Sequence, residues 1–308
     1  MSMLKTLLLL PIIFIVICPI SHSIRNPSTP SPFGFINDLK GSHKGCSIKG
    51  LHKLKHYLKQ FGYLKYGNQS NFNNDVFDTT LESALKTYQR SFSVKPTGTL
   101  DAATVAKMTV PRCGVPDIIN GHNTMLKKYS NDSLSKSINI VAHYALYPNR
   151  PRWPSSRRRL TYGFLPNTRQ DAILAVGYAF RTWDVATQFT FTFSNVRSSA
   201  ESDISIGFFS GDHGDEYPFD NLEYLAHAFP PTDGRLHYNA AQNWVIGHDP
   251  DGVDLYTVGL HEIGHLVGLA HSQDSSSIMY PSISPGETKD LSQDDIDGIM
   301  DLYGLQMK

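Results

Sequence analysis

Three histidines and one glutamate lie close together in the sequence at spacings that suit a metal site. His261 and His265 are four residues apart, so on a helix they share one face. Two imidazoles at that spacing can hold one Zn²⁺, and Glu262 beside them can reach a metal-bound water. Gly268 lets the helix end and the chain turn, so that His271 can return as a third ligand. Three protein ligands leave a fourth position for water, which is typical of a catalytic zinc.

The chemistry that this pattern supports is hydrolysis of a peptide bond. Bound Zn²⁺ lowers the pKa of its water to about 7 and polarises a carbonyl oxygen. Glu262 would take the proton as general base and return it to the leaving amine. Met279, eight residues after His271, matches the methionine turn that forms a floor beneath such a metal. The alternatives are a polymer-binding module and an inactive metal-binding relative, and the intact glutamate argues against the second.

Length and composition fit a globular protein with two domains. The chain has 308 residues, of which 40% are hydrophobic and 18% are charged. Lysine plus arginine equals aspartate plus glutamate, at 28 each, so the charge gives no reason to expect binding to nucleic acid or to an acidic membrane surface. We expect protein or peptide substrates as partners, with a monomer as the default state.

Residues 1–23 have the pattern of a secretory signal peptide. Lys5 supplies the positive charge, 7–20 is an apolar run, and Ser21 and Ser23 are small residues at the spacing that signal peptidase recognises. A membrane anchor is the alternative, but the run is short for a span and contains prolines. We therefore expect cleavage after Ser23 and secretion to the extracellular space or matrix without a membrane anchor.

The cysteines and two sequons fit an exported protein. Cys18 would leave with the signal, and Cys46 and Cys113 could then pair with each other. Asn68 and Asn131 stand in Asn-x-Ser sequons, so both are candidate N-glycosylation sites.

Apolar periodicity divides the chain into a small helical domain and a larger mixed domain. Residues 24–45 are rich in proline, serine and glycine and are expected to form a flexible lead-in. The segment 46–109 is predicted to be a compact bundle of three helices, and 110–150 has the composition of a linker. The mixed strands and late helices that follow indicate an α+β domain. Helices are predicted at 48–61, 79–92, 101–108, 171–187, 253–270 and 292–303, and strands at 160–165, 189–196, 203–209, 225–229 and 244–246.

Taken with these motifs, the chain resembles the matrix metalloproteinases, the matrixins of the metzincin clan. Residues 111–117, Pro-Arg-Cys-Gly-Val-Pro-Asp, match the cysteine switch of that family, in which a thiolate takes the fourth zinc position of the zymogen. The resemblance implies that Cys113 has this role and that Cys46 is an unpaired thiol. The resemblance is to the minimal form of the family, which has no propeller domain, and it is strongest to plant members.

The resemblance also implies a domain layout for a secreted zymogen of a zinc metalloendopeptidase. It places the signal peptide at 1–23, a propeptide at 24–145 and the catalytic domain at 146–308. Within the propeptide, 46–109 would form a peptidoglycan-binding-like bundle that shields the active site. The catalytic domain would have the α+β metzincin fold, with a twisted five-stranded mixed sheet and three helices.

A second zinc site is implied by four residues upstream of the catalytic motif. His213, Asp215, His227 and His237 align with the ligands of the family's structural zinc. Three histidines and one aspartate suit a closed tetrahedral site. We therefore expect two zinc ions, one catalytic and one structural.

The family's calcium sites are matched only in part. Asp220 and Asp203 align with calcium ligands, whereas Asn239 and Gln242 stand where acidic residues are usual and Arg235 stands where an aspartate is usual. Neutral amides keep oxygen donors but lose charge, and Ca²⁺ favours carboxylates. We expect calcium binding that is present but weakened.

By the same resemblance, an extended peptide substrate would pair with an edge strand at 225–229. The main pocket would lie between His261 and 281–283, and we expect an apolar residue after the scissile bond. The arginines at 157–159 could form a convertase site, but a cut there would remove the start of the catalytic domain. A solvated basic turn is preferred, with activation cleavage between 118 and 147.

Overall fold

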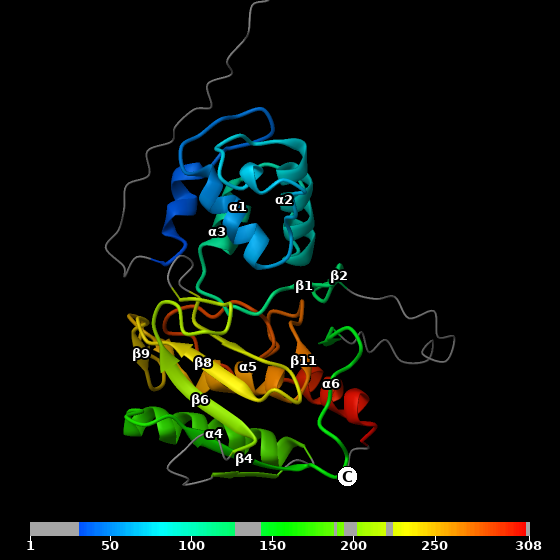
Figure 1. Cartoon of the computed structure of the whole chain (residues 1–308), viewed down its shortest axis with the longest axis vertical. Helices are drawn as coiled ribbons and strands as arrows, with labels where there is room; N and C mark the ends of the chain where they lie inside the picture. The colour runs from blue at the N-terminus through cyan, green and yellow to red at the C-terminus, as the bar shows by residue number, and fades with distance from the viewer. Residues whose placement is uncertain (1–30, 127–142, 188–189, 194–201, 220–223, 306–308) are drawn as a thin grey trace, which may run out of the picture.

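The computed structural model of the chain describes residues 31–126, 143–187, 190–193, 202–219 and 224–305. The predicted signal peptide, Asn131 and Asp220 lie outside the described residues. The described chain forms two units, a helical bundle and a mixed unit of strands and helices, which lie one above the other in Figure 1.

The first unit is a helical bundle around its own hydrophobic core. Helices α1 (Leu51–Gln60), α2 (Thr79–Ser91) and α3 (Ala102–Met108) confirm the three predicted helices. Asp78 and Asp101 cap α2 and α3, each accepting a bond from the backbone N–H three residues on, at 2.8 and 2.9 Å. The bundle also contains the short 3₁₀ helices η1 (Gly34–Leu39) and η2 (Gln69–Asn71).

The expectation of a flexible lead-in before the bundle is wrong for its described part. Phe33, Ile36 and Leu39 are buried in the same core as α1 and α2. Ile36 and Leu39 are three residues apart in η1, which matches the roughly three residues per turn of a 3₁₀ helix, and Phe33 directly precedes the helix, so all three face the bundle. The surrounding prolines, serines and glycines conceal this short apolar face in the sequence.

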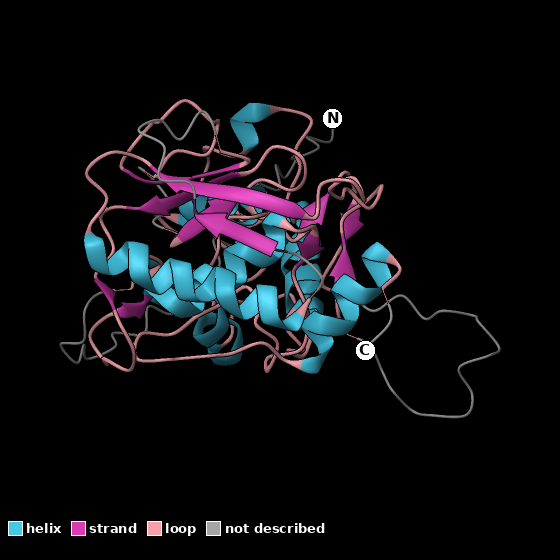
Figure 2. Cartoon of the chain, turned by 90° about the horizontal axis from the view of Figure 1, so that it is seen from below, coloured by secondary structure: helices cyan, strands magenta, loops and turns pink. Residues whose placement is uncertain are grey.

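The second unit is built on a five-stranded mixed sheet with three helices, which confirms the predicted fold class. Its elements are β4 (Arg159–Phe164), α4 (Gln170–Ala186), β5 (Thr190–Phe193), β6 (Ile204–Phe209), β7 (Ala226–Ala228), β8 (Arg235–Asn239), α5 (Leu255–Leu266) and α6 (Gln293–Tyr303). The strand order is β5-β4-β6-β8-β7, and only β7, at one edge, is antiparallel to its neighbour. Figure 2 shows the long helices lying along one face of this sheet.

Three short strand pairs tie the remaining segments together. They are β1 (Ile118–Ile119) with β2 (His122–Asn123), β3 (Ala145–Leu146) with β11 (Leu269–Ala270), and β9 (Trp244–Val245) with β10 (Val253–Asp254). The β3–β11 pair matters most for the site, because β11 ends directly before His271.

Helix α5 is buried along nearly its whole length. Every residue in it except Tyr256 is buried, including the polar residues His261, Glu262 and His265. Asp254 caps it by accepting from the Thr257 N–H at 2.9 Å. Gly268, two residues beyond its end, has a φ of 105°, which residues with a Cβ rarely adopt. The polar side chains of α5 are therefore carried into the interior, and the turn after it is built for glycine.

Polar side chains of α3 and of the second unit join the bundle to that unit. The Gln273 side chain donates to the carbonyls of Arg90 and Ser91 at the end of α2, at 3.0 and 3.1 Å. Lys107 of α3 lies 3.3 Å from the Tyr280 hydroxyl.

Across the residues that the structure describes, no helix is both long and apolar enough to span a bilayer.

Candidate metal centre

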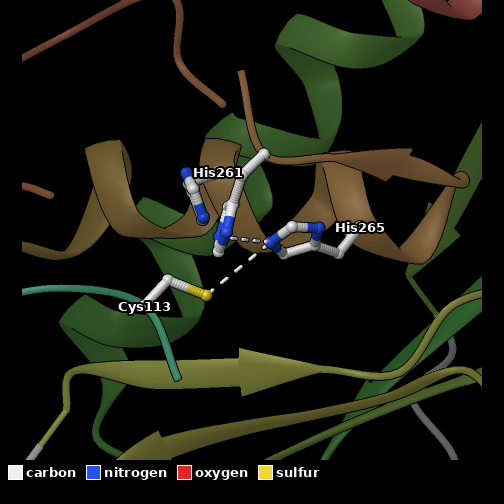
Figure 3. Close-up of side chains that lie close together, drawn as sticks. Cys113, His261 and His265 are labelled. Carbon is white, nitrogen blue, oxygen red and sulfur yellow. Dashed lines mark hydrogen bonds between the residues drawn. The ribbon is translucent and has the colours of Figure 1, made fainter. Parts of the chain in front are cut away.

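The predicted catalytic ligands converge at one buried point. His261 and His265 come from α5, and His271 returns beside them after the turn at Gly268. Cys113 approaches from the segment that joins the two units, and Figure 3 shows its sulfur directed at the His265 ring. Cys113 Sγ lies 3.6 Å from His265 Nε2, which lies 3.2 Å from His271 Nε2. The ligand atoms of all four residues lie within 4.8 Å of one another.

Each histidine uses its outer nitrogen, Nδ1, to donate a hydrogen bond. The acceptors are carbonyl or carboxylate oxygens, so the proton stays on Nδ1 and Nε2 keeps its lone pair for a metal. The ring orientations are fixed by the same bonds. The bonds run from His261 to the Ile278 carbonyl (2.7 Å), from His265 to the Leu269 carbonyl (2.8 Å) and from His271 to Asp117 Oδ1 (2.7 Å).

Several buried polar atoms at this point have no hydrogen-bond partner within the described protein. His261 Nε2 and both Glu262 carboxylate oxygens are buried without a hydrogen-bond partner among the described residues. Burial raises the pKa of Glu262 to about 8 and raises that of the Cys113 thiol. An unsatisfied buried polar group costs about 1–3 kcal/mol. Three imidazole nitrogens and a thiolate are donors that Zn²⁺ prefers, so these residues fit the metal.

Met279 packs against Gly264 of the helix that carries His261 and His265. A Cβ placed on Gly264 would overlap with Met279 Sδ, so the glycine permits the close approach. Asp295, from the first turn of α6, fixes this turn by accepting from the backbone N–H groups of Ile278 and Met279 at 3.0 and 3.2 Å. The Ser277 hydroxyl also donates to Asp295. The role of Asp295 was not predicted from the sequence.

The segment that carries Cys113 lies in a groove with backbone bonds on both sides. On one side the Gly114 N–H donates to the Ala226 carbonyl at 2.8 Å, beside the edge strand β7. On the other, the Cys113 N–H donates to the Pro281 carbonyl at 2.9 Å, and the Ile283 N–H donates to the Pro111 carbonyl at 3.0 Å. The segment therefore lies between β7 and residues 281–283 and is hydrogen-bonded to both.

Arg112 and Asp117 hold the two ends of this segment together. Their side chains form a two-pronged ion pair, with N–O distances of 2.8 and 3.0 Å, and are only 1% and 0% exposed. The Arg112 guanidinium stacks 3.6 Å from the ring centroid of Phe61, at the end of α1. Burial opposes ionisation of Asp117, but Arg112 and His271 outweigh it and keep the carboxyl pKa below its usual range.

The second predicted cluster also forms. His213 Nε2, His227 Nε2 and His237 Nδ1 lie 3.0, 2.6 and 2.6 Å from one oxygen of Asp215. All four ligand atoms lie within 4.8 Å of one another. Three imidazoles and one carboxylate, largely shielded from solvent, suit a closed tetrahedral zinc.

Comparison with known proteins decides the family. Metalloendoproteinase 2-MMP of Arabidopsis thaliana is 42% identical over 297 residues, which are 92% of this chain and 78% of that protein. The chain belongs to the matrixin family. The family model described as Matrixin matches residues 152–304 of this matrixin, and the model described as Putative peptidoglycan binding domain matches 49–108.

Other relatives agree on the class of enzyme and on its form. Metalloendoproteinase 1 of Glycine max is 41% identical over 85% of each chain, and Matrix metalloproteinase-20 of Homo sapiens is 35% identical over 80% of this chain and 47% of that protein. This matrixin is therefore a zinc metalloendopeptidase, and the predicted similarity to plant members is confirmed.

Two of the calcium candidates, Asp203 and Asn239, form hydrogen bonds within the protein. Both oxygens of Asp203 are used, since Thr161 N–H donates to one at 2.8 Å and Arg157 donates to the other. The Asn239 side chain accepts from the Ala241 N–H at 2.9 Å and donates to the Tyr224 carbonyl at 3.1 Å. A cation at these positions would compete with these hydrogen bonds.

Two further residues differ from the sequence expectations or were missed by them. Cys46 is disulfide-bonded and Cys113 is the free cysteine among the described residues, so Cys46 does not pair with Cys113. Because Cys18 lies in the predicted signal peptide, the thiol expected at Cys46 after signal cleavage stays a prediction. The Tyr147 hydroxyl lies 2.9 Å from His265 Nδ1 and was not predicted at the site. A tyrosine in a linker carries no signal of this contact in the sequence.

Proposed function

We propose that this matrixin is a secreted endopeptidase made as a cysteine-switch zymogen, which hydrolyses peptide bonds of extracellular proteins with Glu262 as general base. The observation that carries the proposal is the convergence of three imidazole Nε2 atoms on the thiol of Cys113, with the unpartnered Glu262 carboxylate beside them. The described structure is then the latent form, in which the sulfur occupies the position that a substrate or water needs.

Zn²⁺ held by His261, His265 and His271 would supply Lewis acidity toward a carbonyl oxygen and toward water. Glu262 takes the proton from the attacking water on a carboxylate oxygen, because that oxygen has no other partner among the described residues. The same carboxyl then returns the proton to the leaving amine nitrogen.

The substrate is proposed to lie along the outer edge of β7. That edge now bonds to the switch segment through the Ala226 carbonyl and the Leu225 N–H, so both groups become free when the segment leaves. Backbone pairing there gives affinity for an extended peptide of any sequence. Ile283, buried in the wall opposite, favours an apolar residue after the scissile bond.

Two further metal sites belong to the same proposal, a structural zinc and a weak calcium site. His213, Asp215, His227 and His237 hold a structural zinc. Calcium binds weakly through Asp220, Asp203, Asn239 and Gln242, since it must compete with the hydrogen bonds of Asp203 and Asn239. Equilibrium dialysis that finds no bound Ca²⁺ at millimolar concentration would remove calcium from the account.

Glycosylation is proposed at Asn68 and Asn131. Asn68 is exposed in the bundle, where its side chain accepts a bond from the Ser70 N–H at 3.0 Å. An exposed turn of this kind is open to a modifying enzyme.

The experiment is activation of the purified zymogen with a thiol-reactive mercurial, followed by cleavage of a peptide library and N-terminal sequencing of the processed enzyme. We expect no cleavage before treatment, cleavage before apolar residues after it, and a new N-terminus between 118 and 147. Mercurial treatment that releases no peptidase activity from a zinc-loaded protein would contradict the proposed switch.

A further inference from the structure

The three metal-facing histidines take their outer hydrogen-bond partners from different parts of the chain. His261 and His265 donate to backbone carbonyls that belong to the second unit, at 2.7 and 2.8 Å. His271 donates instead to the Asp117 carboxylate at 2.7 Å. Asp117 belongs to the switch segment, 111–117, which is removed with the propeptide. Two outer partners therefore remain in the mature enzyme, and the third leaves.

Asp117 is itself held firmly by the bundle. Its Oδ1 also accepts from Arg112 at 2.8 Å, and its Oδ2 accepts from Arg112 at 3.0 Å and from the Tyr63 hydroxyl at 2.8 Å. Its backbone N–H donates to the Phe61 carbonyl at 3.1 Å. The carboxylate is 0% exposed, so no water competes for it. Its position, and with it the orientation of the His271 ring, is set by the folded propeptide.

We propose that Asp117 is a positioning residue of the metal centre that acts only in the zymogen, where it fixes the His271 ring and makes the zymogen hold its zinc more tightly than the mature enzyme does. A carboxylate on the outer nitrogen of a metal-bound histidine keeps the proton off the inner nitrogen, orients the ring and raises its basicity. Loss of such a partner typically costs about 10–100-fold in metal affinity. This inference rests on the proposed zinc function of the site.

The propeptide thus contacts the metal centre twice. Cys113 would take the fourth ligand position of the zinc, and Asp117 hydrogen-bonds to the outer nitrogen of the third ligand, His271. The two contacts lie at opposite ends of one short segment that Arg112 bridges, because its guanidinium bonds to both the Asp117 carboxylate and the Cys113 carbonyl. Removal of the segment therefore opens the site and loosens its zinc in one step.

The first test is the zinc affinity of full-length zymogens, measured by competition with a chromophoric zinc chelator. We expect Asp117→Asn to lower the affinity by about 10–100-fold. Tyr63→Phe is the matched control, because it removes a bond to the same carboxylate and leaves the His271 bond in place; it should bind zinc as the wild type does. The second cluster, 213–237, is unaltered in each protein and contributes equally to each titration.

A cobalt-substituted zymogen separates the action of Asp117 from that of the switch. The charge-transfer absorption from sulfur to Co²⁺ reports the Cys113 bond. Arg112→Met is the matched comparison, because it loses the same ion pair as Asp117→Asn but keeps the Asp117–His271 bond, and we expect Asp117→Asn to bind the metal more weakly than Arg112→Met. Unchanged affinity would overturn the inference. So would equal metal affinities of Asp117→Asn and Arg112→Met, because Asp117 would then act only through the ion pair of the switch segment.

A third comparison needs no change at Asp117 and so stands even if that variant does not fold. The Cys113→Ser zymogen and the mature enzyme both lack the thiolate, and we expect the zymogen to bind zinc about 10–100-fold more tightly. Equal affinities would contradict the inference while leaving the enzyme function intact. A wild-type zymogen that binds no zinc at His261, His265 and His271 would instead refute the proposed function.

Discussion

Under the proposed cysteine-switch mechanism, replacing Arg112 with methionine should convert the latent form into a partly open one. The change keeps an unbranched side chain of similar length against Phe61 but removes the charge that faces Asp117. Asp117 would keep its bonds from Tyr63 and His271, but it would be a buried carboxylate without its cation. The cost falls on the closed state, because an open segment exposes the carboxylate to water.

The expected magnitude follows from the burial of the pair, whose side chains are 1% and 0% exposed. Removing one partner of such a pair costs about 3–5 kcal/mol. At about 1.36 kcal/mol per factor of ten, the equilibrium between open and closed switch moves by about 100-fold to 5,000-fold toward the open form.

The assay is peptide hydrolysis by the uncleaved zymogen, together with the rate at which Cys113 reacts with a thiol reagent. Both should rise strongly in Arg112→Met. Arg150→Met is the control, because its ion pair with Asp301 is about half exposed and contributes little. The mature enzyme cut from either zymogen should have wild-type kcat/KM. An Arg112→Met zymogen as latent as the wild type would refute the role given to this ion pair.

Three further outcomes are expected. Gly264→Ala places a Cβ against Met279 Sδ, closer than van der Waals contact allows. We expect a loss of about 1–3 kcal/mol in stability, measured as a lower Tm. An unchanged Tm would show that the contact is not tight. Asp295→Asn weakens the bonds that fix the methionine turn and should lower both Tm and kcat, whereas a change in neither would exclude that function. Asn68→Gln should reduce the endoglycosidase-sensitive shift in electrophoretic mobility of the secreted zymogen, and an identical shift in the variant would place the glycan elsewhere.

Much of the catalytic site could be predicted because it depends on local sequence. His261 and His265 share a face through the helical period alone, and Gly268 marks where the helix must end. Met279 follows in a turn at short range. The helical bundle was found for the same reason, since its apolar residues recur at helical spacing.

The parts that were missed depend on contacts between distant residues. Asp117 meets His271 across 154 positions of sequence, and no local pattern signals that pairing. Asp295 reads as an ordinary residue of a helix start until the turn it holds is brought beside it. Strand β8 was not predicted because His237 and Asn239 interrupt its apolar residues, and the buried setting of the strand removes the alternation that marks a half-exposed one.

The most direct test of the central claim is peptide hydrolysis by the activated Glu262→Ala enzyme, with zinc content measured on the same sample. The Glu262 carboxylate oxygens have no partner among the described residues, so the substitution removes a base without breaking a structural bond. We expect the rate to fall by at least about 100-fold while zinc content stays at the wild-type level. Hydrolysis at the wild-type rate by a zinc-loaded variant would contradict the account.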